Sequence, residues 1–535
     1  MLHLSHSLGA RLVSLALSLL LLFSLGATAA AEDAQKVVNI GVTSTLGSLN
    51  PLLLDAGELN KYAQGLQFLP LFDLDKDLNV VGMLGESFET SDNITYTVKL
   101  NPAATWSDGV PVTADDVVFT VLKLTNKAVG NLTMAGYAAL AGFDEYGNSP
   151  DGATEIEGVT KVDDKTLRFV FKAQTSPATF INSFARYLLT IPKHKLETVA
   201  DADLPTTDWF GHADAVSGPY IVTDFDSNHY VSYAANPAYF RGAPKIGKLN
   251  IKIVEGSQLY AGLKSGEIDF VQPTTGAIPQ EDQAGVEALS GITSVREKPL
   301  TSQPVFINTA KLPDVRVRQA ILYAIDRNLL LGGLLEGRGE VVDGFLSSLS
   351  PFYDAAITPI AYDPAKAKAL LAEAGWDGSQ KLSFVVDSGD STFVQGASVI
   401  AAQLAEVGIT AEIRTVDFAS IWDYVFAGDF DMFSVQYTLT PIDPYPDISW
   451  LLGAGNFLAY ANDEVSRLLT QIGAAEGNDA TRAIYSRINQ IVQAEVPMFN
   501  AYVTAPLGAV SNRLTNAEPH VYGSFNHVEL WDVAQ

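Results

Sequence analysis

A helix that ends at glycine and runs directly into an apolar strand occurs twice in this chain. The first copy ends in Ser265–Phe270 (SGEIDF) and the second in Ala427–Met432 (AGDFDM). Glycine ends helices readily because it reaches the left-handed backbone region without a Cβ penalty. Each copy is therefore predicted to be the helix-to-strand half of a crossover, and the pair predicts two α/β lobes.

The length of the chain agrees with more than one lobe. With 535 residues, it exceeds what one hydrophobic core usually serves. A helix capped by Asp314 opens the second lobe, and a strand through Tyr502 is expected to carry the chain back to the first, so that two crossings form a hinge. We expect lobe I to comprise residues 32–72, 196–300 and 497–535, and lobe II residues 301–496.

The N-terminus has the pattern of a secretory signal peptide. Arg11 precedes an apolar stretch from Leu12 to Leu25, and small residues follow at Ala27 to Ala31. We expect residues 1–31 to be removed by cleavage near Ala29 to Ala31; an uncleaved anchor helix is the alternative. The chain contains no Cys, so it has no cysteine for lipid attachment or disulfides. These features predict a periplasmic protein.

The charge of the chain limits its partners. Its formal net charge is −27 at pH 7. Such a balance disfavours binding to nucleic acid and to anionic membrane surfaces. We expect a protein that works as a monomer and binds no nucleic acid.

Residues 97–122 predict a strand, a turn and a capped helix. The turn is Ser107-Asp108-Gly109, and Thr113 is placed to cap the helix, with its side-chain oxygen accepting from the backbone N–H of Asp116. Asp115 and Asp116 lie in the first turn, where the helix dipole favours negative charge. These acidic residues are therefore predicted to be turn and cap residues rather than catalytic groups.

The same segment resembles the signature of a known family. Asp108 to Val117 is similar to the "DG-x-P-[hydrophobic]-T-A-x-D-V" run of family 5 extracytoplasmic solute-binding proteins, which serve peptide- and nickel-type ABC importers. Three further segments also resemble that family: Gly218-Pro219-Tyr220 with Asn236–Phe240, Asn308-Thr309 with Val315–Arg327, and Tyr362–Gly375. The resemblance implies an α/β, two-lobed periplasmic binding protein (type II, cluster C), with a β-rich insertion at about residues 73–195 of lobe I.

Three patterns that suggest other chemistry do not hold up. Phe384–Gly389 is similar to an aspartic protease flap, but that chemistry needs two carboxylates and only one copy is present. Asp73–Asn79 starts like a calcium loop, yet Leu78 stands where glycine is required; a solvated acidic hairpin is the prediction. The mature histidines lack metal-ligand spacing. We expect no catalytic residue, no metal site and no cofactor.

Residues 429–451 should hold the ligand-binding residues that the resemblance implies. In family peptide binders, an extended ligand pairs with a strand at the cleft edge, an aromatic residue follows, and an Asp then pairs with the ligand ammonium. Tyr437 takes the aromatic position, Thr440 falls where that Asp would be, and Asp443 or Asp447 could replace it. Asp387 stands near the position of a carboxylate-binding Arg. The candidate ligand-binding residues are Ser44, Leu46, Asp387, Phe418, Tyr437, Thr438, Thr440, Asp443 and Trp450.

The predicted function is a non-catalytic receptor. It would capture a ligand between hinged lobes and deliver it to the membrane permease of an ABC importer. An oligopeptide is the first expectation for the cargo. An oligosaccharide stacked on Tyr437, Phe418 or Trp450, or a cationic small molecule drawn by the acidic residues, is the alternative. A secreted hydrolase is the rival from another class.

Overall fold

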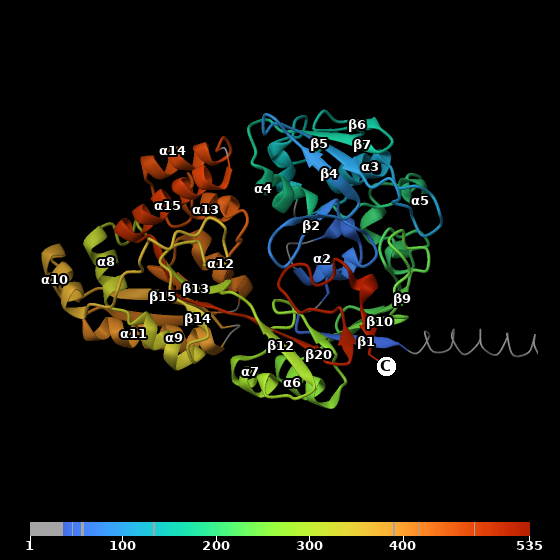
Figure 1. Cartoon of the computed structure of the whole chain (residues 1–535). Coiled ribbons are helices and arrows are strands. Elements are labelled where there is room, and N and C mark those ends of the chain that lie inside the picture. The colour runs from blue at the N-terminus through green and yellow to red at the C-terminus, as the bar shows by residue number, and fades with distance from the viewer. Residues whose placement is uncertain are drawn as a thin grey trace, which may run out of the picture.

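Two mixed β-sheets form the cores of two lobes, and a third, smaller sheet extends from the first (Figure 1). The computed structural model describes residues 36–44, 46–54, 58–131, 134–388, 391–416, 418–475 and 477–534. The predicted signal peptide, residues 1–31, lies outside this part of the chain. The α/β fold and the two lobes predicted from the sequence are confirmed.

Lobe I is built on a seven-stranded sheet in the order β12-β20-β11-β1-β10-β9-β8. β1 runs parallel to β10 and β11, whereas β20 is antiparallel to β11 and β12. Helix α2 (Glu58–Gly65) packs on one face, and α6 (Gly256–Ser265) and α7 (Gln280–Glu287) pack on the other. The strands are β1 (Val37–Val42), β8 (Tyr220–Asp226), β9 (Tyr230–Ala235), β10 (Lys248–Ile253), β11 (Phe270–Val271), β12 (Ile292–Arg296) and β20 (Leu507–Ser511).

The β-rich insertion has its own sheet, in the order β4-β5-β7-β6. It lies above lobe I in Figure 1 and faces lobe II through α4. The strands of the whole insertion are β2 (Phe72–Leu74), β3 (Val80–Gly82), β4 (Gly85–Glu89), β5 (Thr95–Leu100), β6 (Val159–Asp163) and β7 (Thr166–Val170). Its helices are α3 (Ala114–Leu124), α4 (Pro177–Thr179), a π-helical turn at Phe180–Ala185, and α5 (Lys193–Leu196).

Lobe II is a sheet in the order β14-β19-β13-β17-β15-β16, with β18 also paired to β13. Helices α8 to α11 pack on one face, and α12 to α15 pack on the other. The strands are β13 (Thr301–Ile307), β14 (Gly339–Glu340), β15 (Lys381–Asp387), β16 (Thr410–Val416), β17 (Met432–Ser434), β18 (Tyr437–Thr438) and β19 (Met498–Thr504). The helices are α8 (Val315–Tyr323), α9 (Arg327–Leu335), α10 (Pro364–Ala374), α11 (Ser391–Glu406), α12 (Phe418–Ala427), α13 (Tyr445–Leu452), α14 (Asp463–Ile472) and α15 (Gly477–Glu495).

Short elements complete the described chain. Two small strands, β21 (Leu514–Thr515) and β22 (Asp532–Val533), pair with each other near the C-terminus. Single 3-10 turns lie at Pro51–Leu53, Met134–Ala139, Leu204–Thr206, Asp208–Gly211 and Val528–Leu530.

The chain crosses between the lobes twice, and the two crossings lie side by side. The backbone N–H of Glu297 donates to the carbonyl of Pro506 (3.0 Å), and that of Leu300 donates to Thr504 (2.9 Å). The second crossing follows Thr504, because β19 is a strand of the lobe II sheet. This differs from the predicted boundary at residue 497: the strand through Tyr502 precedes the return to lobe I instead of making it.

The strand–turn–helix unit of residues 97–122 forms as predicted, and Thr113 and Asp116 form a reciprocal capping box at the start of the helix. The carboxylate of Asp116 accepts from both the backbone N–H (2.8 Å) and the hydroxyl (3.1 Å) of Thr113. Asp108 accepts from the backbone of Val110 and pairs with His194 (2.9 Å). Asp108 and Asp116 therefore act as turn and cap residues of the insertion.

Candidate functional site

Strand β18 lies where lobe II meets the crossing segments, and one of its edges is free. Tyr437 is paired with Ser302 and Thr438 with Thr301, and the Ser302 hydroxyl donates to the Tyr437 carbonyl (3.1 Å). Within the described residues, β13 is the only strand that pairs with β18. A strand edge with unpaired N–H and C=O groups is a template for an extended peptide.

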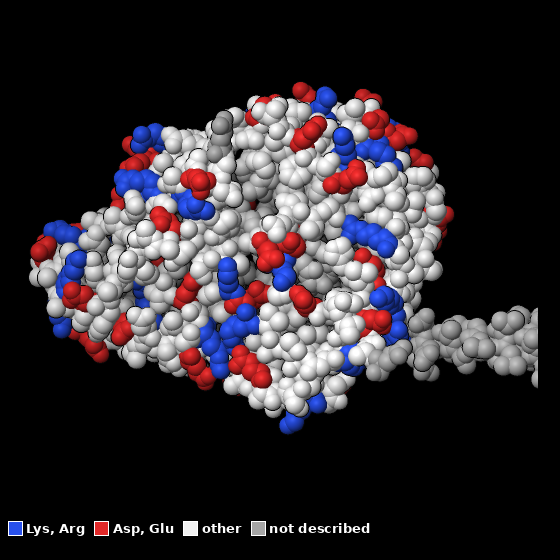
Figure 2. Space-filling view, in the orientation of Figure 1, with Lys and Arg blue, Asp and Glu red and all other residues white. Residues whose placement is uncertain are grey.

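The segment that follows β18 projects from lobe II onto lobe I. Ile442 is buried in the hydrophobic core of the insertion. The next residue, Asp443, accepts a hydrogen bond from the hydroxyl of Thr179, which ends α4 of the insertion. A second contact between the lobes joins the Asn93 amide to the carbonyl of Gly473 (3.5 Å). The lobes therefore touch along a seam, and Figure 2 shows the hollow that remains between them.

On the lobe II side of this seam, Tyr437, Thr440 and Asp447 are hydrogen-bonded to one another. The Tyr437 hydroxyl donates to Asp447 (2.7 Å), and Thr440 donates to Asp447 from both its hydroxyl and its backbone N–H. Burial raises the pKa of Asp447, and these hydrogen bonds oppose that shift. Thr440, at the position where an ammonium-binding Asp was expected, thus holds a carboxylate in place instead of supplying one.

Asp443 is the most unusual group of the seam. Its side chain is 2% exposed, and its Oδ2 atom has no hydrogen-bond partner among the described residues. Burial raises the pKa of Asp443 to about 7, the negative charge of Asp447 adds to this, and the Thr179 hydroxyl opposes it. Buried carboxylates without a cation or a full set of donors are costly. The site therefore favours a positively charged group next to Oδ2.

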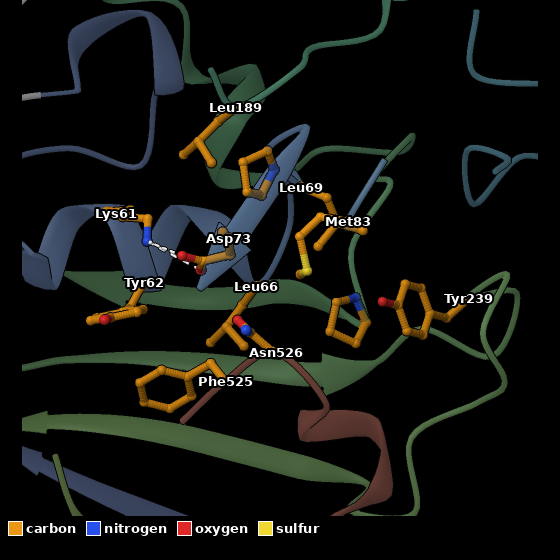
Figure 3. Close-up of a pocket in the computed structure, with 13 residues that line it drawn as sticks. Lys61, Tyr62, Leu66, Leu69, Asp73, Met83, Leu189, Tyr239, Phe525 and Asn526 are labelled. Carbon is orange, nitrogen blue, oxygen red and sulfur yellow. Dashed lines mark hydrogen bonds and ion pairs between the residues drawn. The ribbon is translucent and has the colours of Figure 1, made fainter. Parts of the chain in front are cut away.

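The lobe I side contains a buried charge network that sequence reasoning did not find. The Lys61 ammonium contacts both oxygens of Asp73 (3.0 and 3.1 Å), and Arg186 Nε donates to Asp73 (2.8 Å). Figure 3 shows Lys61 of α2 pointing at Asp73 of β2. Burial opposes ionisation of Asp73, yet the charges of Lys61 and Arg186 hold its pKa below its usual value. The prediction of a solvated acidic hairpin is therefore wrong at Asp73.

Tyr522 connects this network to lobe II. The Arg186 guanidinium lies 5.1 Å from the centre of the Tyr522 ring. Burial raises the pKa of Tyr522, Arg186 opposes this, and Asp447 of lobe II adds to it. The cavity beside Lys61 and Asp73 has a volume of about 30 Å³, room for little more than a water molecule. It is too small for a peptide.

Two more predicted residues lie at the lobe II sheet edge that faces lobe I. Asp387 ends β15 opposite Val416, and Val386 is paired with Ser434, just before β18. Phe418 begins α12 directly after that edge; its side chain lies outside what the structure describes. The structure thus brings the backbones of Asp387 and Phe418 to the same edge as Tyr437, Thr438 and Thr440.

The remaining predicted residues lie elsewhere. Ser44 follows β1 and is exposed, whereas Leu46 is 2% exposed and packs in the core of lobe I. Trp450 lies on α13 with its ring 4.6 Å from that of Phe457, and it lines a groove of about 710 Å³ with Phe426. All the residues that line this groove belong to lobe II. Trp450 therefore lines a groove that lobe II forms by itself.

Sequence reasoning missed several residues of the seam because no local pattern marks them. Lys61, Asp73, Thr179, Arg186 and Tyr522 are far apart in the chain and meet only in the fold. Asp443 and Asp447 were found because they follow a recognisable strand. The one available signal for the others was Asp73, an acidic residue within an apolar strand.

Comparison with known proteins agrees with this architecture. The sequence profile of the bacterial extracellular solute-binding proteins, family 5 (middle region), matches residues 79–458. The chain belongs to this family. Its members are solute-binding receptors, so the two-lobed fold and the seam described above are those of a receptor that captures a solute from outside the cytoplasm.

Individual relatives support the assignment over nearly the whole chain. A protein of Brucella ovis assigned as an ABC transporter peptide-binding protein is 27% identical over 89% of this chain and 89% of its own length. The oligopeptide-binding protein AppA of Bacillus subtilis is 26% identical over 86% of this chain and 85% of its own. The structure of AppA with a nonapeptide has a TM-score of 0.73, at 24% identity over 94% of this chain and 100% of that one.

Two further features concern the described residues alone, namely membrane-spanning helices and metal-binding clusters. In this part of the chain, no helix combines the length and the apolar character needed to cross a membrane. Nor do three or more His, Asp or Glu side chains of the described residues gather in a way that could hold a metal ion.

Proposed function

We propose that this protein binds oligopeptides outside the cytoplasm and delivers them to the permease of an ABC importer. The observation that carries the proposal is the free edge of β18 at the seam between the lobes. Main-chain hydrogen bonds from such an edge hold a peptide independently of its side chains. The peptide-binding names of the two relatives described above support the same cargo.

The seam suggests how a peptide would be oriented. Its backbone would pair with Tyr437 and Thr438, and its amino-terminal ammonium would lie against Asp443, with Asp447 close by. A hydrogen bond to a charged group contributes about 1.5–3 kcal/mol. Asp387 and Phe418 lie at the same sheet edge and would contact ligand side chains farther along. Closure of the lobes would then bury the peptide.

The proposal includes the route and the partner of the receptor. Residues 1–31 would direct export and be removed near Ala29 to Ala31, leaving a monomer without a lipid anchor. The peptide-loaded, closed form would be what the permease recognises. N-terminal sequencing of the exported protein tests the cleavage site: a chain that still begins at Met1 contradicts it.

A cationic small molecule is the second candidate cargo. The unpaired, buried Asp443 beside Asp447 favours it, because both carboxylates lack a cationic partner among the described residues. A small cation would use this pair but would leave the edge of β18 empty.

A thermal-shift assay separates these cargoes. The purified protein is heated with pools of peptides of increasing length, with free amines of similar size, or with oligosaccharides. Ligands that bind the folded state raise the melting temperature, by an amount that grows with the logarithm of the ratio of ligand concentration to Kd. We expect a shift with peptides and recovery of the peptides intact. A shift with amines alone would favour the second candidate, and cleaved peptides would indicate a hydrolase.

A further inference from the structure

The groove beside Trp450 begins at the end of β13 that is far from β18. It is lined by Asn308, which follows β13, by the C-terminal end of α12, and by residues at and after the end of α13. Strand β13 is seven residues long and pairs with β18 at Thr301, its first residue. An extended strand of that length spans about 20 Å. Asn308 therefore lies at the opposite end of β13 from the free strand edge.

Four aromatic rings form a continuous band at this groove, namely Trp422, Phe426, Trp450 and Phe457. The ring centre of Trp422 lies 5.9 Å from that of Phe426 and 5.5 Å from that of Trp450. Phe457 lies 4.6 Å from Trp450. Phe426 is 71% exposed and Trp450 is 41% exposed. Single exposed apolar residues are ordinary, whereas contiguous exposed ones mark binding surfaces. The other lining residues include five small ones, which leave the rings uncovered: Ala427, Gly428, Ala454, Gly455 and Ala459.

The groove offers ring faces but no free side-chain acceptor. None of the residues that line it is Asp, Glu, Lys, Arg or His. Asn308 Oδ1 already accepts from two backbone N–H groups (3.1 and 3.3 Å), and Asn456 Oδ1 accepts from two more (3.1 Å each). An amide oxygen has two lone pairs, so both are fully used. The hydroxyl oxygen of Ser449 is buried, so a ligand in the groove does not reach it.

This combination selects among the classes of ligand. A primary ammonium group and a sugar both carry several N–H or O–H donors, which would lose water without gaining acceptors. An anion would lie against the negative faces of the rings. A trimethylammonium group carries a positive charge that the rings attract, it has no N–H, and its methyl groups pack on aromatic faces. It is the class that the groove suits.

The rings of the band have no cation from the chain itself. Among the described residues, no Lys or Arg lies over one of them. Beside the groove, Asp423 neighbours Phe426 on the surface of α12, Asp429 pairs with Arg414 (3.4 Å), and Lys311 follows the end of β13. These flanking charges balance, so the local attraction comes from the rings. The net charge of −27 adds a general attraction for cations.

We propose that the aromatic band of lobe II binds the trimethylammonium group of a small-molecule solute, at a site separate from the seam. The hollow has a volume of about 710 Å³, and ligand sites commonly measure about 300–1,000 Å³. Because every lining residue belongs to lobe II, the site is complete whether the lobes are open or closed. The receptor thus carries a second ligand site that does not depend on its cargo.

The proposal is independent of the proposed function. A trimethylammonium group has no N–H to donate to Asp443, so its binding does not report on the seam. Failure of peptides to bind would overturn the proposed function and leave this site unaffected. Failure of the experiment below would overturn this site and leave the proposed function unaffected.

The experiment compares two compounds of the same shape. Choline carries a trimethylammonium group, and dimethylbutanol is its neutral isostere, with carbon in place of the charged nitrogen. The full exported protein, whose sequence contains six Trp, is labelled with fluorotryptophan, and fluorine NMR spectra are recorded during titration with each compound. The resonance of Trp450 is the one missing from Trp450→Phe. Sodium chloride at the same ionic strength is the control for salt.

We expect choline to shift the Trp450 resonance with a Kd at least about fivefold lower than that of dimethylbutanol. Sodium chloride should leave the resonance unchanged. Equal binding of the two compounds would show that the groove recognises apolar shape and not charge, and would overturn the proposal. A Trp450 resonance that does not respond to choline would overturn it as well.

Three variants locate the site. Phe426→Leu keeps an apolar side chain at a 71% exposed position but removes the ring, and we expect it to weaken choline binding at least about threefold. Tyr146→Leu, at a 66% exposed tyrosine of the insertion, is the matched control and should bind like the wild type. Asp443→Asn should also bind choline normally. Loss of choline binding in Asp443→Asn, with none in Phe426→Leu, would place the cation in the seam and overturn the proposal.

A final arm separates a free solute from a lipid headgroup, which can carry the same trimethylammonium group. The wild type and Phe426→Leu are sedimented with phosphatidylcholine vesicles. We expect neither protein to sediment with the vesicles, in agreement with a free solute. Sedimentation of the wild type that is lost in Phe426→Leu would assign the headgroup as the ligand and overturn the solute.

Discussion

The hydroxyl of Tyr437 donates a 2.7 Å hydrogen bond to the carboxylate of Asp447, ten residues further along the chain. This bond ties the free-edged strand β18 to the first turn of α13 and fixes the intervening segment, which carries Thr440 and Asp443 onto lobe I. The strand edge and the acidic pair therefore move as one unit. In the proposed function, the same short stretch of lobe II would set both the orientation of the peptide and the recognition of its charge.

Removing the Tyr437 hydroxyl tests this unit. Tyr437→Phe takes one donor from a buried carboxylate, so we expect a loss of about 1–3 kcal/mol in the free energy of unfolding and weaker peptide binding. Urea unfolding and calorimetric titration measure the two effects. Tyr146→Phe, at a 66% exposed tyrosine, serves as the control. Unchanged stability in Tyr437→Phe would show that the bond is not maintained in solution.

A methyl group at the seam should hold the lobes apart. Gly473 has φ −62°, which suits alanine, but a Cβ atom there would lie 2.4 Å from the carbonyl oxygen of Gln174 in the insertion. We expect Gly473→Ala to fold normally and to bind cargo at least about tenfold more weakly, because the closed fraction falls. Gly332→Ala, at a helix position with open space around it, is the control. Equal affinities in both variants would contradict the closed seam.

The charge network of lobe I should depend on Asp73. Asp73→Asn leaves Lys61 and Arg186 buried without their shared partner, and we expect a loss of about 3–5 kcal/mol in the free energy of unfolding. The pKa of Asp73 is lowered by these two cations, so its contribution is present above about pH 4 and is lost as the pH falls below that value.

Urea unfolding of Asp73→Asn and wild type at pH 7 and pH 3 measures this difference, with the exposed Asp151→Asn as the control. The difference in the free energy of unfolding between Asp73→Asn and wild type should be smaller at pH 3 than at pH 7. A gap that does not change with pH would mean that the network is not ionised.

The pair His520–Glu297, beside the first crossing, should contribute to stability with a pH dependence opposite to that of Asp73. His520 pairs with Glu297 (2.7 Å), next to the first crossing, and this hydrogen bond raises the pKa of His520. A His pKa that is higher in the folded state than in the unfolded state stabilises the fold fully below about pH 6.5. This stabilisation is lost as the pH rises through the pKa of the folded state. We expect His520→Gln to lower the melting temperature more at pH 6 than at pH 9. Glu297→Gln should show the same trend; no trend in either variant would contradict the pairing.

We expect Trp450 to lie outside the ligand-binding site, and its replacement tests this. Because its groove contains residues of lobe II alone, we expect Trp450→Ala to bind peptide within about twofold of wild type, although it loses aromatic packing with Trp422 and Phe457. Calorimetric titration decides the matter. A loss of affinity beyond about tenfold would place Trp450 in the ligand site.

The parts of the fold that local chemistry specifies were predictable from the sequence. Gly266, with φ +78°, ends α6 as expected, and the strand–turn–helix of residues 97–122 forms because its turn and cap residues leave few alternatives. The acidic segment after β18 was also located, since a strand followed by a fixed pattern marks it. The Thr113 cap was predicted, and the reciprocal bonds from Thr113 to the Asp116 carboxylate complete the capping box.

The parts that depend on contacts between distant segments were not predictable. Asp73 resembled a solvated turn residue until Lys61 and Arg186 supplied its charge partners. Trp450 and Leu46 were reasonable candidates by type, yet one faces a groove of lobe II and the other lies in the core of lobe I. Tertiary packing decides which charged groups are buried and which surface each side chain lines. The local sequence carries no signal for either property.

The most direct test of the account is native mass spectrometry of the receptor purified without denaturation from the cells that export it. We predict that the wild type carries intact peptides with free amino termini, and that Asp443→Asn carries fewer of them and admits peptides with blocked amino termini. A wild-type protein loaded with neutral sugars or amino-blocked molecules, or one that retains no peptide in any preparation, would contradict it.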